Sequence, residues 1–363
     1  MRKILLLIFI LTIFTPFAMT QYKELLTRKQ VDTIGFASNA KKMEVVMERI
    51  QVNFGELIND LRKANKVTDD AKWKTAICPH DDYTYANYLY PLVLKNIKAK
   101  TIILFGVAHK AKMFGLENKL VFDSFDQWQS AYGPVKISSL RDELIKNLNT
   151  NSYVVHDSMQ AVEHSVEAIV PFLQYYNPKV EIVPVLVPYM PYQKIEELAD
   201  DFAKALNKVT KDRKLKWGED FAIVISNDAV HYGDEEWGGS NYAFMGADSA
   251  GYQKAMTHEK EIISNCLTGK INPERIKQFT QYTVQADDYR QYKWTWCGRY
   301  SVPLGLMVSY DLSKLQKTSI KGHLLGYSTS ISEKNPDFTD IGMGATAVAN
   351  IHHWVGFTAI GYR

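Results

Sequence analysis

The chain has 363 residues, of which 46% are hydrophobic and 23% are charged, as expected for an ordinary globular protein with a large buried core. A formal net charge of +3, without any run or stripe of Lys and Arg, gives no support to a nucleic-acid partner. The sequence also lacks a Gly-rich phosphate loop and a nucleophile elbow, which disfavours nucleotide binding and serine hydrolysis.

The first twenty residues have the order typical of a secretory signal peptide. Basic residues at positions 2 and 3 precede an apolar run at 4–14, and the small residues Ala18 and Thr20 follow. We expect cleavage after Thr20, which leaves 21–363 as the mature chain in the periplasm or outside the cell. The apolar run is short for a membrane span, so no span is expected after cleavage, and an uncleaved anchor is the alternative.

Further along, an amphipathic helix is predicted at residues 38–65, where apolar residues recur at intervals of three and four. Apolar runs typical of buried strands then alternate with helical spacing. The expected order is strand 73–78, helix 85–97, strand 101–105, helices 140–148 and 163–175, strand 180–187, helix 194–209 and strand 221–226. This alternation predicts an α/β sandwich around a central mixed sheet.

The last third of the chain is predicted to end in antiparallel strands. After a polar, Gly-rich loop at 233–241, helices are expected at 249–266 and 273–279. Strands are then expected at 323–329, 345–349 and 355–360, with a polar turn at 332–340. Because no repeat or Pro-rich linker interrupts the chain, a single domain is expected.

Two of the expected strands deliver a histidine at their C-terminal ends. His80 follows the strand 73–78, and His109 follows the strand 101–105. Open α/β sheets bind ligands at the carboxyl ends of their strands, so we expect both side chains at one edge of the sheet. Taken singly, each histidine also has a structural interpretation as a packing or capping residue.

A third segment, 226–233, repeats this layout and carries Asp228 and His231. If the segment turned into a helix, these two side chains would be neighbours, since they are three residues apart. Imidazole and carboxylate groups together suit iron, zinc, copper or manganese, and carboxylates also orient ligating imidazoles. The three segments together indicate a metal site.

These motifs resemble those of the Memo family, the protein B component of the AmmeMemoRadiSam system. The resemblance runs from about residue 73 to the C-terminus and keeps the order of the motifs. Six motifs of the family have counterparts here. They are the Pro-His-Ala-Gly-Tyr type at 79–83, the Gly-Pro-Ser-His type at 106–109, the Glu-His-Ser-x-Glu type at 163–173, the Ser-x-Asp-x-x-His-x-Gly type at 226–233, the Cys-Gly pair at 297–298 and the Val-Gly-Tyr-Ala-Ala type at 355–359.

The resemblance implies a fold similar to that of LigB-type class III extradiol dioxygenases, which hold non-haem iron with two histidines and a carboxylate. It further implies a Memo-type pocket of two histidines and a cysteine, here His80, His109 and Cys297. Such a pocket would bind iron or copper, and its thiolate would favour Cu(I). Asp228 and His231 would line it, with His231 as catalytic acid or base and Asp228 as the residue that orients it.

The chain departs from the family pattern beside His80, where Asp81 and Asp82 replace Ala-Gly. A carboxylate at this place would supply the acid that a dioxygenase-like triad requires, or it would cap the expected helix 85–97. The capping interpretation is favoured, because Asp is a preferred N-cap residue.

Three further residues are assigned to the surroundings of the pocket. Glu163 and His164 stand at the expected start of a helix, where they would support the ligands or ligate the metal directly. Tyr83 belongs to a set of aromatic residues near the site. Such sets mostly reflect packing, but they would also suit an aromatic small molecule or a peptide side chain.

Cysteine usage excludes a disulfide framework, because the chain has only three cysteines. Cys78 is expected to be a small buried strand residue, and a disulfide with Cys297 in an oxidising compartment is the alternative. Cys266 is expected to lie at a helix end without a role.

Two functions follow from this pattern, and a third is weaker. The first is an exported metalloenzyme with redox or dioxygenase-like chemistry. The second is a non-catalytic metal- or peptide-binding protein on a vestigial dioxygenase fold. A zinc hydrolase is the weaker third, because the chain lacks a compact zincin motif.

Overall fold

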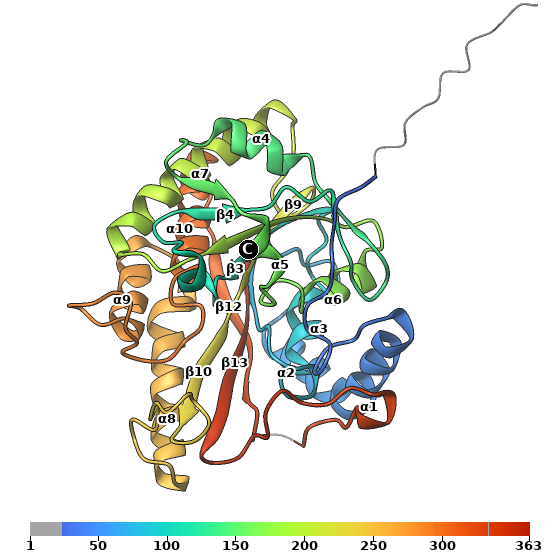
Figure 1. Cartoon of the computed structure of the whole chain (residues 1–363), viewed down its shortest axis with the longest axis vertical. Helices are drawn as coiled ribbons and strands as arrows, with labels where there is room; N and C mark the ends of the chain where they lie inside the picture. Colours follow the sequence, from blue (N-terminus) through green and yellow to red (C-terminus); the bar gives the residue numbers. More distant parts are fainter. Residues whose placement is uncertain (1–23, 333) are drawn as a thin grey trace, which may run out of the picture.

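The computed structural model describes residues 24–332 and 334–363, which fold around one sheet with helices on both faces (Figure 1). The signal peptide expected at residues 1–20 lies outside this part of the chain. Within the described part, no helix is both long and apolar enough to cross a membrane.

Thirteen strands of the described residues form one mixed sheet, which confirms the predicted fold class. The main strand order is β1-β5-β6-β8-β3-β9-β2-β13-β12-β11, while β10 pairs with β13, and β4 pairs with β7 and β8. The strands are β1 (Thr27–Arg28), β2 (Thr75–Cys78), β3 (Thr101–Val107), β4 (Leu120–Phe122), β5 (Gln127–Trp128), β6 (Val135–Ile137), β7 (Tyr153–Val155), β8 (Glu181–Val187), β9 (Phe221–Ser226), β10 (Asp228–Gly233), β11 (Gly269–Lys270), β12 (Lys321–Thr329) and β13 (His353–Tyr362).

Helices cover both faces of this sheet. α1, α3 and α6 pack on one face, and α4, α7 and α10 pack on the other (Figure 1). The α-helices are α1 (Ala40–Ala64), α2 (Tyr83–Ala86), α3 (Leu89–Leu94), α4 (Leu140–Asn147), α5 (Asp157–Ala161), α6 (Val170–Tyr176), α7 (Tyr192–Asp212), α8 (Ser249–Ile262), α9 (Pro273–Thr283) and α10 (Ser301–Leu315). Shorter turns form the 3-10 helices η1 (Ala111–Phe114) and η3 (Thr339–Ile341) and the π-helix η2 (Ile263–Leu267).

The central strands β2, β9, β3 and β8 run parallel and are buried on both faces. In β3, Ile102 and Leu104 pack into one apolar core, while Ile103 and Phe105 pack into the other. Side chains alternate across a strand, so a continuous apolar run is what two helical layers require. The common direction of these strands brings their C-terminal ends to one edge of the sheet.

Two predicted helices differ from the observed ones. The helix expected at 85–97 is two short helices, α2 and α3, because Asn87 has φ 16° and ψ −102°, outside the helical region. The helix expected at 163–175 begins only at Val170. Residues 163–169 instead form a turn. In this turn, the Glu163 carboxylate accepts the backbone N–H groups of His164 and Ser165.

The C-terminal region departs from prediction in three places. α10 was not predicted. Residues 345–349 form no strand, because Asp82 and Tyr85 side chains bind their backbone groups. The segment that follows Ser226 is the strand β10 and not a helix, with a bulge between Asp228 and His231. The remaining predicted helices and strands lie within a few residues of the observed bounds.

Candidate metal centre

The candidate site lies beyond the C-terminal ends of β2, β3 and β9. Because these strands are parallel, the chain leaves each of them at the same edge of the sheet. A cavity of about 490 Å³ lies at this edge. Seven of the nine predicted site residues line it: His80, Asp81, His109, His164, Asp228, His231 and Cys297.

His80 is buried, and its position is determined by β9 and β10. Its backbone N–H donates to Asp228 Oδ1 at 2.9 Å, and its Nε2 lies 3.2 Å from Asp228 Oδ2. Its Nδ1 lies 2.7 Å from Ser226 Oγ, which in turn donates its hydrogen to the Ser165 carbonyl oxygen at 2.5 Å. The Ser226 hydroxyl has only one hydrogen, so it accepts from His80 and fixes Nδ1 as the protonated nitrogen.

This tautomer places two acceptors against each other. The lone pair of His80 Nε2 faces a carboxylate oxygen of Asp228, and such a contact is favourable only when a proton or a cation lies between them. Burial lowers the pKa of His80 well below its usual value, and the facing histidines lower it further, so the ring is neutral. Burial raises the pKa of Asp228 to about 7. A metal ion would satisfy both groups.

His109 follows β3, and Glu163 fixes its orientation. The Glu163 carboxylate accepts hydrogen bonds from the His109 backbone N–H at 2.7 Å and from its ring Nδ1 at 2.8 Å. It also accepts the N–H groups of His164 and Ser165, each at 3.0 Å. Burial opposes ionisation, but His109 and these donors outweigh it and lower the pKa of Glu163 to about 2. Nε2 of His109 is therefore left free, in the carboxylate–histidine arrangement common at metal sites.

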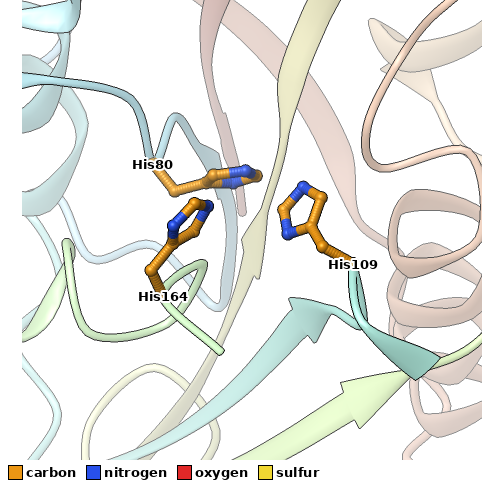
Figure 2. Close-up of side chains that lie close together, drawn as sticks. All are labelled: His80, His109 and His164. Atoms are coloured by element: carbon orange, nitrogen blue, oxygen red, sulfur yellow. The ribbon is translucent and has the colours of Figure 1, made fainter. Parts of the chain in front are cut away.

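His164 brings a third imidazole to the site. Figure 2 shows the rings of His80, His109 and His164 turned toward one another, and their ligand nitrogens lie within 4.8 Å of each other. His164 is half-exposed, and its Nδ1 lies 3.5 Å from Asp32 Oδ2. The placement suits direct ligation, one of the two roles considered for His164 from sequence.

Cys297 belongs to a second group of candidate ligands, which also contains His80. Ligand atoms of His80, Asp228 and Cys297 lie within 4.8 Å of one another. Cys297 Sγ lies 2.9 Å from Nε2 of His231, whose pKa burial lowers to about 3. In the described structure, His109 and Cys297 therefore fall in different candidate groups, so the predicted trio does not form one compact set.

The cysteines are separate thiols in the structure. Cys78 is buried within β2, as expected, and Cys266 lies in the π-helix η2. Burial raises the pKa of Cys297 well above its usual value, with Asp228 adding to the effect. Metal coordination is the ordinary way in which such a thiol loses its proton.

Neither carboxylate after His80 caps a helix. Asp82 occupies the N-cap position of α2 but makes no side-chain cap hydrogen bond. Its oxygens instead accept the backbone N–H of Thr346 at 2.5 Å and the hydroxyl of the same residue at 2.8 Å. Asp81 accepts the Asp82 N–H at 2.6 Å and faces the cavity. The favoured capping interpretation is wrong because a long-range contact uses the carboxylate.

Tyr83 does not line the cavity. Its ring is fully buried between Phe36, Tyr90 and Phe172, and its hydroxyl donates to the Ala168 carbonyl oxygen at 2.8 Å. It supports the turn between Glu163 and α6 from the core. The packing interpretation of this aromatic residue therefore applies.

The donors gathered here fit a transition-metal ion. Imidazoles with hydrogen-bonded Nδ1 atoms, a thiol and an acceptor carboxylate are the ligand types of iron, copper and zinc sites. Two sets of side chains would hold the ion, either His80, His109 and His164 or His80, Asp228 and Cys297. The donors alone do not distinguish between these metals.

Sequence reasoning missed part of the cavity wall. Asp32 and Phe36 come from the segment before α1, and Thr346 comes from the loop before β13. None of them follows a strand or belongs to a motif. Their positions arise from contacts between distant loops, for which the sequence carries no periodic signal.

The chain is similar in sequence to known proteins of one family. A family model described as Memo-like protein matches residues 45–346. A MEMO1 family protein of Aquifex aeolicus is 33% identical over 164 residues, 44% of this chain and 55% of the relative. One of Thermococcus kodakarensis is 24% identical over 203 residues, 53% of this chain and 61% of the relative.

A relative from Nitrosopumilus maritimus, also named a MEMO1 family protein, matches over a greater length. It is 23% identical over 306 residues, 83% of this chain and 91% of the relative. The chain spans less than two thirds of the length of the two relatives from Aquifex and Thermococcus. The match of the family model over most of the chain nevertheless shows that this protein belongs to the Memo-like protein family.

Proposed function

We propose that this protein binds one iron or copper ion at His80 and His109 and uses it in redox chemistry on a small molecule. The observation that carries the proposal is the contact between His80 Nε2 and Asp228 Oδ2, 3.2 Å apart, with the ring proton engaged at Nδ1. Two buried acceptors in this arrangement are satisfied by a proton at low pH and by a cation once Asp228 is ionised. The carboxylate-bound His109 supplies a second free nitrogen beside it.

When bound, the ion would supply one-electron chemistry that no side chain of the protein provides. His231 is neutral near pH 7, because burial lowers its pKa to about 3, so in the metal-free protein its ring is a hydrogen-bonding group and only a weak base. Its present partner at that atom is the Cys297 thiol, 2.9 Å away. Asp228 acts on the adjacent His80 by accepting its backbone N–H, and so keeps the ring in place.

Metal content of the anaerobically purified chain from Gln21 onward tests the proposal. We expect near-stoichiometric iron or copper in the wild type and large losses in His80→Ala and His109→Ala. His258→Ala is the matched control, because His258 lies on α8 away from the cavity. No metal in the wild type, and none taken up from Fe(II), Cu(I) or Zn(II), would reject the proposal.

Catalysis is tested separately with the iron-loaded protein. Ring opening of catechols in the presence of O₂ is expected if the site works as in the dioxygenases whose fold it resembles. Absence of turnover over a broad panel of catechols would reject that activity while leaving metal binding intact.

The alternative function is a metal- or peptide-binding protein without catalysis. It is supported by Asp228, whose Oδ1 is already used by the His80 backbone N–H, and by the thiol of Cys297, which is hydrogen-bonded to His231. A metal site of this kind would have no open position for a substrate. Tight metal binding combined with no exchange of ligands in the metal's absorption spectrum would favour this function.

We also propose that the protein is exported, on the basis of the basic, apolar and small-residue order of residues 1–20. Expression of the full chain, followed by fractionation and N-terminal sequencing, is the test. A mature chain beginning at Gln21 outside the cytoplasm is expected, and an intact N-terminus retained with the cytoplasmic fraction would contradict it.

A further inference from the structure

A second cavity adjoins the candidate metal centre and is markedly basic. It has a volume of about 350 Å³ and shares His109, Tyr292 and Cys297 with the metal cavity. None of the described residues that line it is acidic. Its basic side chains are Lys112, Arg290 and Arg299.

Arg299 is the buried member of this set. Its side chain is sandwiched by aromatic rings, with Cζ 3.4 Å from the ring centre of Tyr292 and 4.8 Å from that of Tyr300. Only 9% of the residue is exposed. Nη2 donates to the Arg290 carbonyl oxygen at 3.2 Å, while the buried Nε has no hydrogen-bond partner.

The other buried arginines of the described chain all have a carboxylate partner. Arg28 pairs with Glu167, Arg62 with Asp69 and Arg141 with Asp123. Arg299 makes no ion pair with any described residue. Stacking on two tyrosine rings offsets part of the desolvation of this charge, but it leaves the guanidinium N–H donors without a carboxylate. The missing partner is therefore expected to come from a ligand.

The other two basic residues of this cavity lie at the protein surface. Arg290 lies at the surface and pairs with Glu117 at 2.7 Å, and Lys112 is exposed. They add positive potential at the mouth of the cavity, which draws anions toward Arg299. The metal cavity on the other side of Tyr292 has an aromatic lining that includes Phe36, Trp237 and Tyr242.

We propose that Arg299 binds the carboxylate of a small aromatic acid whose ring occupies the metal cavity. A guanidinium presents paired N–H donors that match the two oxygens of a carboxylate. Arg299 lines the same cavity as Cys297 and His109, so one ligand can reach both the carboxylate subsite and the metal-binding side chains. The inference rests on the proposed function for the identity of the site and adds the substrate class.

Calorimetric binding of two matched probes tests the inference. The probes are 3,4-dihydroxybenzoate and its uncharged amide, 3,4-dihydroxybenzamide, measured with Zn(II)-loaded and metal-free protein. The wild type should bind the acid about tenfold more tightly than the amide, a difference of about 1.4 kcal/mol. In Arg299→Gln the preference for the acid over the amide should fall below about threefold, which corresponds to a fraction of a kcal/mol. The affinity for the amide should change little.

The control is Arg213→Gln, which removes a surface arginine paired with Glu143 and should retain the preference. Arg299→Lys should retain part of it, and decides the matter if Arg299→Gln does not fold. Equal affinity of the wild type for both probes, binding of neither, or an unchanged preference in Arg299→Gln would overturn the inference. Failure to bind Zn(II) would instead count against the proposed function, because the preference is also measured without metal.

Discussion

Two carboxylates at the metal centre have pKa values displaced in opposite directions, and the difference lies in their partners. Glu163 is buried, yet four N–H groups and the charge of His109 hold its pKa at about 2. Asp228 is equally buried, but its carboxylate accepts a hydrogen bond from the backbone N–H of His80, and burial raises its pKa to about 7. Asp228 thus lacks the positive partner that Glu163 has, and a metal ion would supply it.

The pH dependence of stability checks this reading of Asp228. Its pKa is raised from 3.8 to about 7 in the folded state, so the folded protein binds more protons between these values and loses stability as pH rises. In metal-free protein, Asp228→Asn should gain stability relative to wild type between about pH 4 and 7, on the order of 4 kcal/mol. Urea unfolding at pH 4 and pH 8 measures this difference.

The control for this experiment is Asp212→Asn, the same change at an exposed position on α7. Added metal should reverse the order at pH 8, because an ionised Asp228 then has a cation beside it. The same stability difference between Asp228→Asn and wild type at both pH values would show that Asp228 is not protonated in the folded state.

At the scale of helices and strands, a helix can be predicted where the spacing of its apolar residues indicates a single buried face. α7 places apolar residues at intervals of three and four, and was predicted within a few residues. α10 packs against α7, α9 and β9, so it is apolar nearly all round and has no period to detect. The central strands were predictable for a different reason, because burial on both faces gives each of them a short continuous apolar run, and His80 and His109 follow two of these runs.

The start of α6 could not be predicted, because the Glu163 side chain, which would suit the start of a local helix, binds a residue far away in the sequence. Glu163 resembles a residue at the start of a helix, yet its carboxylate binds His109, 54 residues away. Asp82 likewise binds Thr346, 264 residues away, instead of capping α2. Competition between local and long-range hydrogen bonds is decided by the folded structure, which sequence spacing does not contain.

Glu259 shows how one buried side chain joins several elements. From α8, its Oε1 accepts the indole N–H groups of Trp294 and Trp296, each at 2.6 Å. Its Oε2 accepts the Val230 backbone N–H of β10 at 3.3 Å and the Tyr327 hydroxyl of β12 at 3.0 Å. Four donors converge on a group that has only acceptors, so the charged carboxylate is the form that satisfies them.

We expect Glu259→Gln to destabilise the protein by about 2–4 kcal/mol, because the amide NH₂ then faces donors and leaves buried groups unsatisfied. Burial raises the pKa of Glu259 to about 7, so unfolding is measured at pH 8, where the carboxylate is ionised. Lys260→Gln, at the next and exposed position of α8, should change stability by less than about 0.5 kcal/mol. Equal stabilities of the two variants would show that the four donors have other acceptors.

At the scale of the whole molecule, the segment before α1 is attached to the turn that carries the site. The buried guanidinium of Arg28 donates to Glu167 and lies 4.2 Å from the ring centre of Trp128. Glu167 also accepts the Asp32 N–H at 2.7 Å. Asp32 and Phe36 then line the metal cavity. One buried ion pair therefore couples this segment, which precedes the residues matched by the family model, to the site.

Breaking this ion pair should release the segment from the site. Arg28→Ala leaves the Glu167 carboxylate buried without its counter-ion, and should cost about 3–5 kcal/mol of unfolding free energy. Adding Glu167→Gln to Arg28→Ala should cost less than the sum of the single changes, since the pair acts as a unit. Lys29→Ala, at the exposed neighbouring position, is the control.

Hydrogen exchange gives the decisive measurement for Arg28→Ala. We expect faster exchange of the Val31 and Asp32 amides, while β3 and β9 stay protected. Slow exchange of these amides in Arg28→Ala would mean that other contacts hold the segment over the cavity.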